Sequence, residues 1–394
     1  MIKYNKRKST FMLYLGILCS ISLIGTMTGC ERQPKNVMNN NSIQEQTPPI
    51  AYNIYIENSG SMVGYCNFSD ANALETLVGD YYDRLTESIN DGDTVTLNFI
   101  NTSIVPSKEE KNKFLSSIKG KCTAPFTKID QMLEMMMNNV QENDVNILVS
   151  DYVFSTNQGN PQTASSDITK LFTNQLKTKD FTVAMFKYMV NFKGKYYPGG
   201  LSCNKPLPIY IWIFGNSNVL AKLNTEVLFK GLEKYGYDNI ISYCPKTSIP
   251  YDITNRALIS KTINPIKGDY NATIRADFCT TLQSEDVLLN LDNYSFNNQN
   301  LIIENIKPII ATEREYSHFI NITIPKGVNI AEDYLILKAP NMPSWVLESN
   351  DESGENVKGN LDKTTGIKYL IGGVSDAYKK DNVLTTLKFT VKRK

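Results

Sequence analysis

The chain has 394 residues, of which 41 are Lys or Arg and 40 are Asp or Glu, and it contains one histidine. This nearly balanced charge, without a Lys/Arg-rich run, argues against nucleic acid as a partner. The length beyond the N-terminal segments exceeds one ordinary hydrophobic core, so we expect two domains.

Residues 1–29 have the three parts of a signal peptide. Four basic residues between Lys3 and Lys8 precede a mostly apolar stretch over residues 11–27, and small residues lead into Cys30. The apolar stretch is shorter than the roughly 20 residues that a membrane-spanning helix needs. An uncleaved N-terminal anchor helix is the alternative. Both interpretations put the folded part outside the cytoplasm, on a membrane.

The ending Met-Thr-Gly-Cys resembles the lipobox of bacterial lipoproteins. This resemblance implies cleavage before Cys30, diacylglycerol on the Cys30 thiol and a lipid-anchored protein of the bacterial cell envelope. It does not specify whether the membrane is the inner or the outer one, or which face carries the protein. Residues 30–49 are rich in Asn, Gln, Glu, Ser and Pro and offer almost nothing to bury. This composition indicates a disordered, lipidated tether.

Residues 50–250 alternate between strand and helix patterns. Runs of β-branched and aromatic residues predict strands, and apolar residues three and four positions apart predict amphipathic helices. The predicted strands cover residues 50–57, 94–100, 103–105, 145–149, 181–189 and 208–214, and the predicted helices cover 71–89, 108–118, 127–140, 165–176 and 216–235. The alternation indicates an α/β fold with a doubly wound, mostly parallel sheet, which binds ligands beyond the carboxyl ends of its strands.

Polar residues stand at three of these strand and helix ends. The segment 57–61 (Glu-Asn-Ser-Gly-Ser) follows the first strand, Thr127 opens a helix, and Asp151 ends the central strand. This pattern, carried by residues 50–244, resembles the von Willebrand factor A (VWA) domain family. The metal-ion-dependent adhesion site of that family consists of Asp-x-Ser-x-Ser, a Thr on a second loop and an Asp ending a later strand. Glu57 stands where the family has Asp, and four positions match: Ser59, Ser61, Thr127 and Asp151.

The resemblance implies a VWA (Rossmann-like) fold and a cation, Mg²⁺ or else Mn²⁺ or Ca²⁺, that grips an acidic residue of a protein partner. Such hard cations take oxygen ligands, and Ser and Thr hydroxyls supply oxygen without adding charge. Glu57 is one methylene longer than Asp, and Mg²⁺ tolerates misplaced ligands poorly. The alternative is a degenerate, metal-free site in which Ser59 and Ser61 cap the loop and Asp151 hydrogen-bonds to them.

Residues 191–208 depart from the family, which usually has a helix there. The segment contains Gly and Pro and has no helical period, so we expect a hairpin or a loop insertion. It is either a partner-binding element, because loops often carry function, or a simple surface insertion.

The cysteines beyond Cys30 are odd in number: Cys66, Cys122, Cys203, Cys244 and Cys279. Exported proteins can form disulfides. Cys66 and Cys122 fall in loops that we expect to meet at the cation site. We therefore expect a disulfide that joins these two loops at the edge of the site. Cys203 and Cys244 are a second possible pair. Free thiols are the alternative, because connectivity does not follow from sequence.

The region 259–394 has a different pattern. Short predicted strands recur between turn residues, and a helix is expected at 364–378, before the last strand. The strands cover 271–278, 287–291, 301–310, 319–325, 334–338 and 383–391. This spacing favours an antiparallel, immunoglobulin-like sandwich that acts as a spacer or a partner surface.

The sequence favours a binding protein over an enzyme. His318, expected at a strand start, is not placed beside a nucleophile, and the chain has no Cys-x-x-Cys, dinucleotide-binding or P-loop motif. We therefore expect a membrane-anchored lipoprotein that binds a protein partner through a divalent cation and a partner carboxylate. The alternative is a structural subunit of an envelope assembly with a metal-free site.

Overall fold

The computed structural model describes residues 48–394 except 71–72, 154–159, 198, 223–238, 256–257, 310–315, 353–357, 380–381 and 394. The predicted signal peptide, Cys30 and nearly all of the tether lie outside the described residues. Among the described helices, none is long and apolar enough to cross a membrane.

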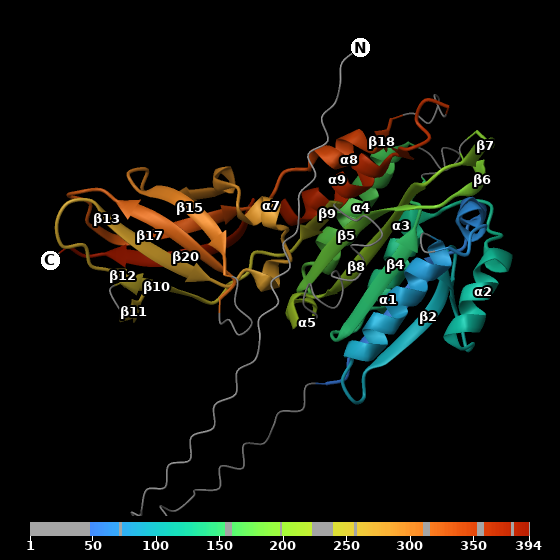
Figure 1. Cartoon of the computed structure of the whole chain (residues 1–394), viewed down its shortest axis with the longest axis horizontal. Helices are drawn as coiled ribbons and strands as arrows, with labels where there is room; N and C mark the ends of the chain where they lie inside the picture. Colours follow the sequence, from blue (N-terminus) through green and yellow to red (C-terminus); the bar gives the residue numbers. More distant parts are fainter. Residues whose placement is uncertain are drawn as a thin grey trace, which may run out of the picture. The chain divides into compact units, whose positions relative to one another are not determined.

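The largest sheet in the described part of the chain has the strand order β3-β2-β1-β4-β8-β5-β9 (Figure 1). Central β1 pairs in parallel with β2 and β4, whereas every other neighbouring pair is antiparallel. The strands are β1 (Ala51–Glu57), β2 (Thr94–Ile100), β3 (Ile104–Pro106), β4 (Asp144–Ser150), β5 (Phe181–Val190), β8 (Leu207–Asn216) and β9 (Asn239–Tyr243). The predicted α/β class is thus confirmed, with a parallel centre of β2, β1 and β4.

The sheet differs from a doubly wound one where β5 leads into β8. These strands are joined by a hairpin of β6 (Lys193–Tyr196) and β7 (Leu201–Asn204), not by a crossover helix. Parallel neighbours need a long crossover connection. The hairpin therefore makes β8 run antiparallel to β5, and β8 then inserts between β4 and β5.

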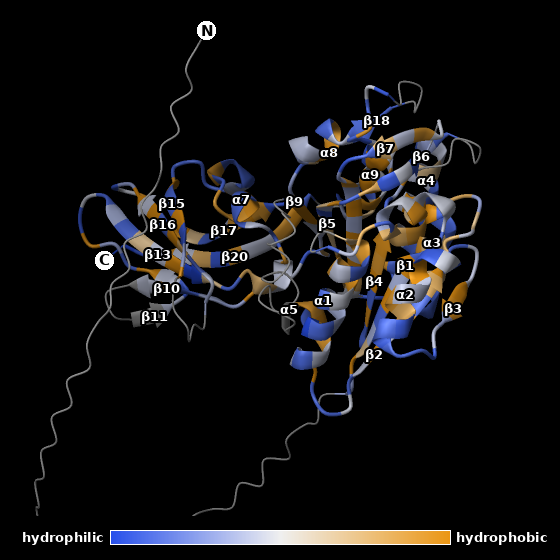
Figure 2. Ribbon diagram, turned by 45° about the vertical axis from the view of Figure 1, so that its right-hand side comes forward, coloured by the Kyte–Doolittle hydropathy of each residue, from blue (hydrophilic) through white to orange (hydrophobic). Residues whose placement is uncertain are grey.

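Helices cover both faces of this sheet. Alternate residues of a strand point to opposite faces, so Ile54 and Ile56 pack with one cluster and Tyr55 with the other. The first face is covered by η1 (Gly60–Cys66), α1 (Leu74–Ser88) and α2 (Lys111–Lys121). The second face carries α3 (Ile129–Asn139) and α4 (Pro161–Gln175). Figure 2 shows strongly hydrophobic colouring along β4, as expected for a strand covered on both sides.

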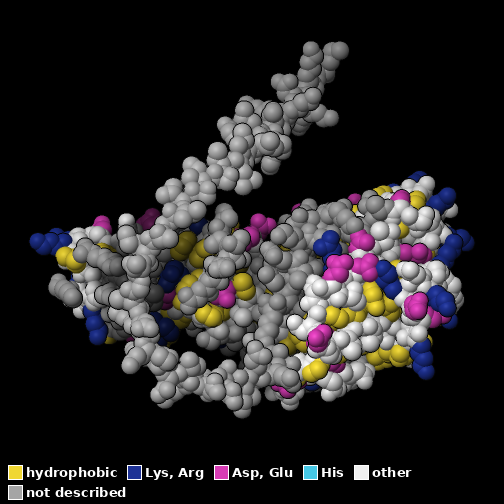
Figure 3. All heavy atoms as spheres, turned by 60° about the horizontal axis from the view of Figure 1, so that its bottom comes forward, with side chains coloured by type: hydrophobic (Ala, Val, Ile, Leu, Met, Phe, Trp, Pro, Cys, Tyr) yellow, Lys and Arg dark blue, Asp and Glu magenta, His cyan; other side chains and the backbone are white. Residues whose placement is uncertain are grey.

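The helix predicted at 216–235 is described only in its first part, as α5 (Ser217–Lys222), and the rest lies outside the described residues. On the face shown in Figure 3, acidic and basic side chains are interspersed. This distribution agrees with the absence of a basic stripe in the sequence.

The C-terminal region has two further sheets, with strand orders β11-β10-β13-β16-β15 and β12-β20-β17-β14, around a shared hydrophobic cluster. All their neighbouring pairs are antiparallel except β12 with β20. The strands are β10 (Tyr251–Asn255), β11 (Leu258–Ser260), β12 (Thr262–Ile263), β13 (Tyr270–Ala276), β14 (Tyr294–Phe296), β15 (Ile302–Pro308), β16 (His318–Ile324), β17 (Ile330–Lys338) and β20 (Val383–Val391).

The prediction of a strand at 287–291 is wrong. This stretch contains the end of α7 (Glu285–Leu288) and the start of a 3₁₀ helix, η5 (Leu291–Asn293). Ser284 occupies the N-cap position, and Glu285 and Asp286 lie in the first turn of α7. Acidic residues at this place favour a helix start, and their influence outweighs the short apolar run.

A segment between β17 and β20 returns to the first sheet. It contains α8 (Ser344–Glu348), the short strands β18 (Asn350–Asp351) and β19 (Thr364–Thr365), and α9 (Ile367–Tyr378). Helix α9 packs on α4, where Thr169 donates a hydrogen bond to the Gly373 carbonyl at 3.0 Å. The predicted helix is thus present, but its apolar side chains join the core of the α/β sheet although it lies within the range expected for the β domain.

Candidate functional site

The candidate site lies at the carboxyl ends of β1 and β4. These strands are parallel neighbours in which Ile56 pairs with Val149, so Glu57 at the end of β1 lies beside Ser150 at the end of β4. Parallel strands bring their following loops to one sheet edge. The first loop also lies alongside the loop after α2, because the Gly60 amide donates to the Ala124 carbonyl at 2.8 Å.

Glu57 is the centre of this site. Its carboxyl is fully buried and accepts hydrogen bonds from the hydroxyls of Thr127 and Ser150, one on each oxygen. The Ser59 hydroxyl is a further hydrogen-bond partner. The structure therefore brings Glu57, Ser59 and Thr127 together from two loops, as the sequence predicts. It adds Ser150, whose only signal in the sequence is its position directly before Asp151.

Asp151 lies at the other side of the same cluster and is 3% exposed. One of its oxygens accepts from the Val153 amide at 3.1 Å, and the Ser61 hydroxyl is a second partner. The hydroxyls of Ser59 and Ser61 lie 2.8 Å apart. A continuous chain of hydroxyls therefore joins the carboxyls of Glu57 and Asp151, and all five residues predicted from the sequence meet.

The backbone bends sharply after Asp151. Tyr152 has a φ of 52°, a left-handed conformation that a bulky residue rarely adopts. Its amide donates to the Ser150 hydroxyl at 2.9 Å, and its buried ring stacks on Trp212 with the centroids 5.0 Å apart. Strained residues of this kind persist where the surroundings fix them, often at functional sites. Asp151 directly precedes this bend and has the Ser61 hydroxyl as a hydrogen-bond partner.

Two acidic side chains are thus buried without a basic partner among the residues that the structure describes. Burial, and then the neighbouring Asp151, raise the pKa of Glu57 to about 7, although its hydroxyl partners oppose this shift. Burial likewise raises the pKa of Asp151. Among the described residues, no Lys or Arg forms an ion pair with either carboxyl. Buried carboxylates are costly without compensating positive charge, so this site favours either a proton or a cation.

The donor set fits a hard cation. It offers two carboxyls and the hydroxyls of Ser59, Ser61, Thr127 and Ser150, and these oxygen ligands suit Mg²⁺ or Ca²⁺ more than zinc. A hydroxyl that donates its proton to a carboxyl keeps its lone pairs for a cation. In the described part of the chain, no three His, Cys, Asp or Glu residues cluster in a way that could hold a metal. A cation here therefore depends on the hydroxyls.

The hairpin β6–β7 lies beside this site. The Asn67 side chain donates to the Lys193 carbonyl at 2.6 Å, and a Cβ atom at Gly194 would lie 3.1 Å from the Cα of Gly64. Burial, and then the nearby Asp151 carboxyl, raise the pKa of Tyr196. The insertion predicted at 191–208 is therefore a hairpin that packs on η1, the helix directly after Ser59.

The five cysteines in the described residues are thiols. The Cys66 and Cys122 side chains are buried in one hydrophobic cluster and hydrogen-bond to each other. Cys203 belongs to this cluster too, whereas Cys244 lies in the core of the C-terminal sheets. The first predicted pair is therefore in contact, and the second is not brought together.

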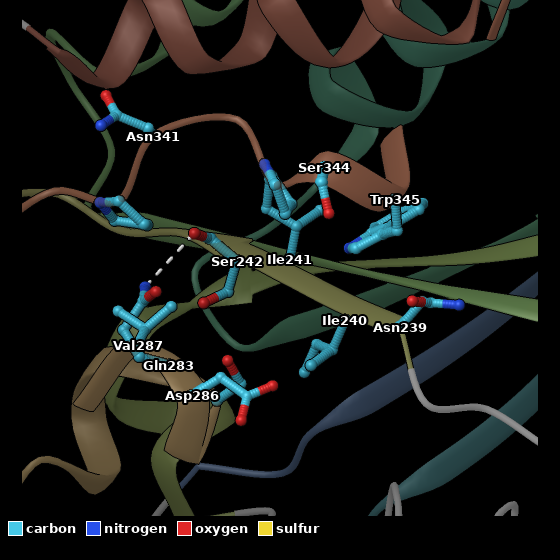
Figure 4. Close-up of a pocket in the computed structure, with 13 residues that line it drawn as sticks. Asn239, Ile240, Ile241, Ser242, Gln283, Asp286, Val287, Asn341, Ser344 and Trp345 are labelled. Atoms are coloured by element: carbon cyan, nitrogen blue, oxygen red, sulfur yellow. Dashed lines mark hydrogen bonds between the residues drawn. The ribbon is translucent and has the colours of Figure 1, made fainter. Parts of the chain in front are cut away.

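A pocket of about 330 Å³ lies elsewhere, at the outer strand β9 (Figure 4). Its wall combines β9, the start of α7 and residues 340–345, including Trp345. The Gln283 side chain donates to the Ser242 carbonyl at 3.2 Å within it. Because β9 ends the sheet whereas β1 and β4 form its centre, this pocket is separate from the carboxyl site.

His318 is buried on β16, with its ring nitrogens near the Ser317 hydroxyl at 2.8 Å and a Glu285 carboxyl oxygen at 3.4 Å. It is thus part of the C-terminal sheets, as the sequence predicts.

No model of a known protein family matches this sequence, and no curated protein is significantly similar to it.

Proposed function

We propose that this chain is a lipid-anchored envelope protein whose α/β domain, of VWA type, binds a protein partner through a divalent cation. Five residues would hold the cation: Glu57, Ser59, Ser61, Thr127 and Asp151. The observation that carries the proposal is a pair of buried carboxyls near the ends of parallel strands. Hydroxyls enclose both carboxyls, and neither has a basic partner in the described part of the chain.

The residues around the two carboxyls have separate roles in positioning them. Thr127 and Ser150 fix the Glu57 carboxyl by donating to its two oxygens, and Ser61 fixes Asp151. Burial excludes water, which strengthens attraction between the carboxylates and a cation. When bound, Mg²⁺ would offer an open coordination position to a carboxylate of the partner.

The surroundings of the site suit a protein partner. Phe126, next to Thr127, is 39% exposed, and the hairpin beside the site carries Tyr197 at 46% and Leu201 at 38% exposure. The side chains of Lys193 and Lys195 are exposed on the same hairpin. Aromatic residues are enriched at protein interfaces, and the lysines favour an acidic partner surface.

A structural subunit with a metal-free site is the second candidate. It is favoured by the hydrogen bonds that Thr127 and Ser150 already make to both oxygens of Glu57. With its raised pKa, Glu57 would keep a proton and share it with Asp151. The cluster would then hold the two loops together without a cation.

Copurification from membranes separates the two candidates. The tagged chain is purified from detergent-solubilised membranes in Mg²⁺ or in EDTA, as wild type, Asp151→Asn and Asp130→Asn. Asp130 is exposed in the first turn of α3 and loses the same charge. We expect one partner to copurify in Mg²⁺ with wild type and Asp130→Asn, and to be absent in EDTA or with Asp151→Asn. Equal recovery under all conditions would support the metal-free subunit.

A further inference from the structure

Cys66 and Cys122 are adjacent although they are distant in sequence. Cys66 is the last residue of η1, and Cys122 is the C-cap of α2, which packs against η1. Both side chains are almost completely buried in the same cluster, and their thiols hydrogen-bond to each other. The Cys66 thiol also lies 3.6 Å from the Met62 carbonyl oxygen.

These thiols stand at the ends of the two loops that carry the site hydroxyls. Cys66 follows Ser61 along the first loop, and Cys122 precedes Thr127 along the second. The loops already pair through the backbone, because the Ala124 amide donates to the Asn58 carbonyl at 3.1 Å. A bond between the thiols would close the same contact covalently.

We propose that Cys66 and Cys122 are a disulfide-bonding site, and that their cross-link staples together the loops of the carboxyl site. The two thiols lose two protons and two electrons, and one S–S bond forms. The electrons reduce a disulfide donor, such as a disulfide-bearing oxidoreductase or oxidised glutathione, to two thiols. The cross-link does not depend on a bound cation.

The surroundings select this pair and the moment of its formation. Among the other described cysteines, Cys244 lies in a different hydrophobic cluster, Cys279 is exposed, and the Cys203 thiol has the Lys205 backbone as its hydrogen-bond partner. The reactive species is the thiolate, and the hydrogen bond with Cys66, together with burial, raises the pKa of the Cys122 thiol in the folded chain. The bond therefore forms while the chain folds, and is then protected from reduction.

Peptide mapping tests the pairing. The full chain is reduced and denatured, refolded in reduced and oxidised glutathione, alkylated and digested. We expect a peptide that joins Cys66 to Cys122, with Cys203, Cys244 and Cys279 alkylated. A folded product in which Cys66 and Cys122 are both alkylated, or in which either is joined to another cysteine, would overturn the proposal.

Thermal unfolding tests the staple. Closing a long loop lowers the entropy of the unfolded chain, so the oxidised chain should melt about 5 °C above the reduced chain. Cys66→Ala should lose this difference, and Cys244→Ala, a matched buried control, should keep it. If Cys66→Ala does not fold, the comparison of oxidised with reduced wild type still decides. Equal melting temperatures of those two forms would contradict the staple.

Discussion

Ser150 and Glu57 end neighbouring parallel strands, and the Ser150 hydroxyl donates its proton to the Glu57 carboxyl in the interior of the protein. The other oxygen of Glu57 accepts from Thr127, which belongs to a different loop. One buried carboxyl therefore joins three segments of the chain. The protonation of the Glu57 carboxyl and the length of the Glu57 side chain should both affect cation binding and stability, and each can be tested.

Stability without metal should fall as pH rises. Burial raises the pKa of Glu57 to about 7, whereas a Glu in an unfolded chain titrates near about 4.3. Stability from this group is therefore fully present below about pH 4 and is lost as pH rises through about 7, a change on the order of 3 kcal/mol. Urea denaturation in EDTA at several pH values measures it. Glu57→Gln should flatten the dependence, and an unchanged slope in this variant would contradict the assignment to Glu57.

Shortening the side chain at position 57 should strengthen binding of the cation. Glu57→Asp withdraws the carboxyl by one methylene, which opens space between the hydroxyls. We expect Mg²⁺ to bind about tenfold more tightly, which corresponds to about 1.4 kcal/mol. The metal-free protein should lose about 1–2 kcal/mol of stability, because the hydrogen bonds from Thr127 and Ser150 lengthen. Calorimetry and urea denaturation measure the two effects. Glu87→Asp, at an exposed position of α1, should change neither.

The hairpin packs closely on η1 because Gly64 has no Cβ atom, so a larger residue at position 64 should be destabilising. A Cβ atom there would lie 2.1 Å from the Phe192 ring, whereas one at Gly120 of α2 would meet nothing within 4 Å. Gly64→Ala should therefore cost about 1–3 kcal/mol through overpacking. Gly120→Ala should be neutral or stabilising by up to about 1 kcal/mol, because Ala favours helix. Urea denaturation compares the two, and equal effects would show that the hairpin does not pack on η1.

Two adjacent glycines test the packing of α9 on α4. A Cβ atom at Gly373 would lie 2.5 Å from the Ser165 carbonyl oxygen, whereas one at Gly372 would find its nearest neighbour at 3.6 Å. Gly373→Ala should lower the free energy of unfolding by about 2 kcal/mol. Gly372→Ala should be nearly neutral. A similar loss in both variants would indicate that α9 does not depend on this close contact.

Local patterns were sufficient for much of the α/β region. The periodicity over 71–89 and 127–140 predicts helices that correspond to α1 and α3. The meeting of Glu57 and Asp151 also follows, because loops after parallel strands share a sheet edge. Thr127 stands on the loop between α2 and α3, and its place at the site was expected from the family resemblance. The role of Ser150 does not follow, because it depends on the register of β1 against β4.

The remaining differences come from long-range contacts. An amphipathic period at 364–378 predicts a helix but does not say which core its apolar face covers, and α9 covers the first sheet. The direction of β8 depends on the hairpin before it. Strands β9 and β10 were not predicted, because each has only five residues and turn residues lie close by. Their pairing partners stabilise them more than their own composition does.

Binding of Mn²⁺ tests the proposed cation site most directly. Mn²⁺ accepts the same oxygen ligands as Mg²⁺. The electron paramagnetic resonance signal measures the free ion, and the bound Mn²⁺ is the total concentration minus the free concentration. We predict that each wild-type chain binds one Mn²⁺, that Mg²⁺ displaces it, and that Asp151→Asn loses it while Asp130→Asn keeps it. The absence of binding at millimolar Mn²⁺, or equal binding by Asp151→Asn, would contradict the account and leave the carboxyls of Glu57 and Asp151 as a metal-free link between two loops.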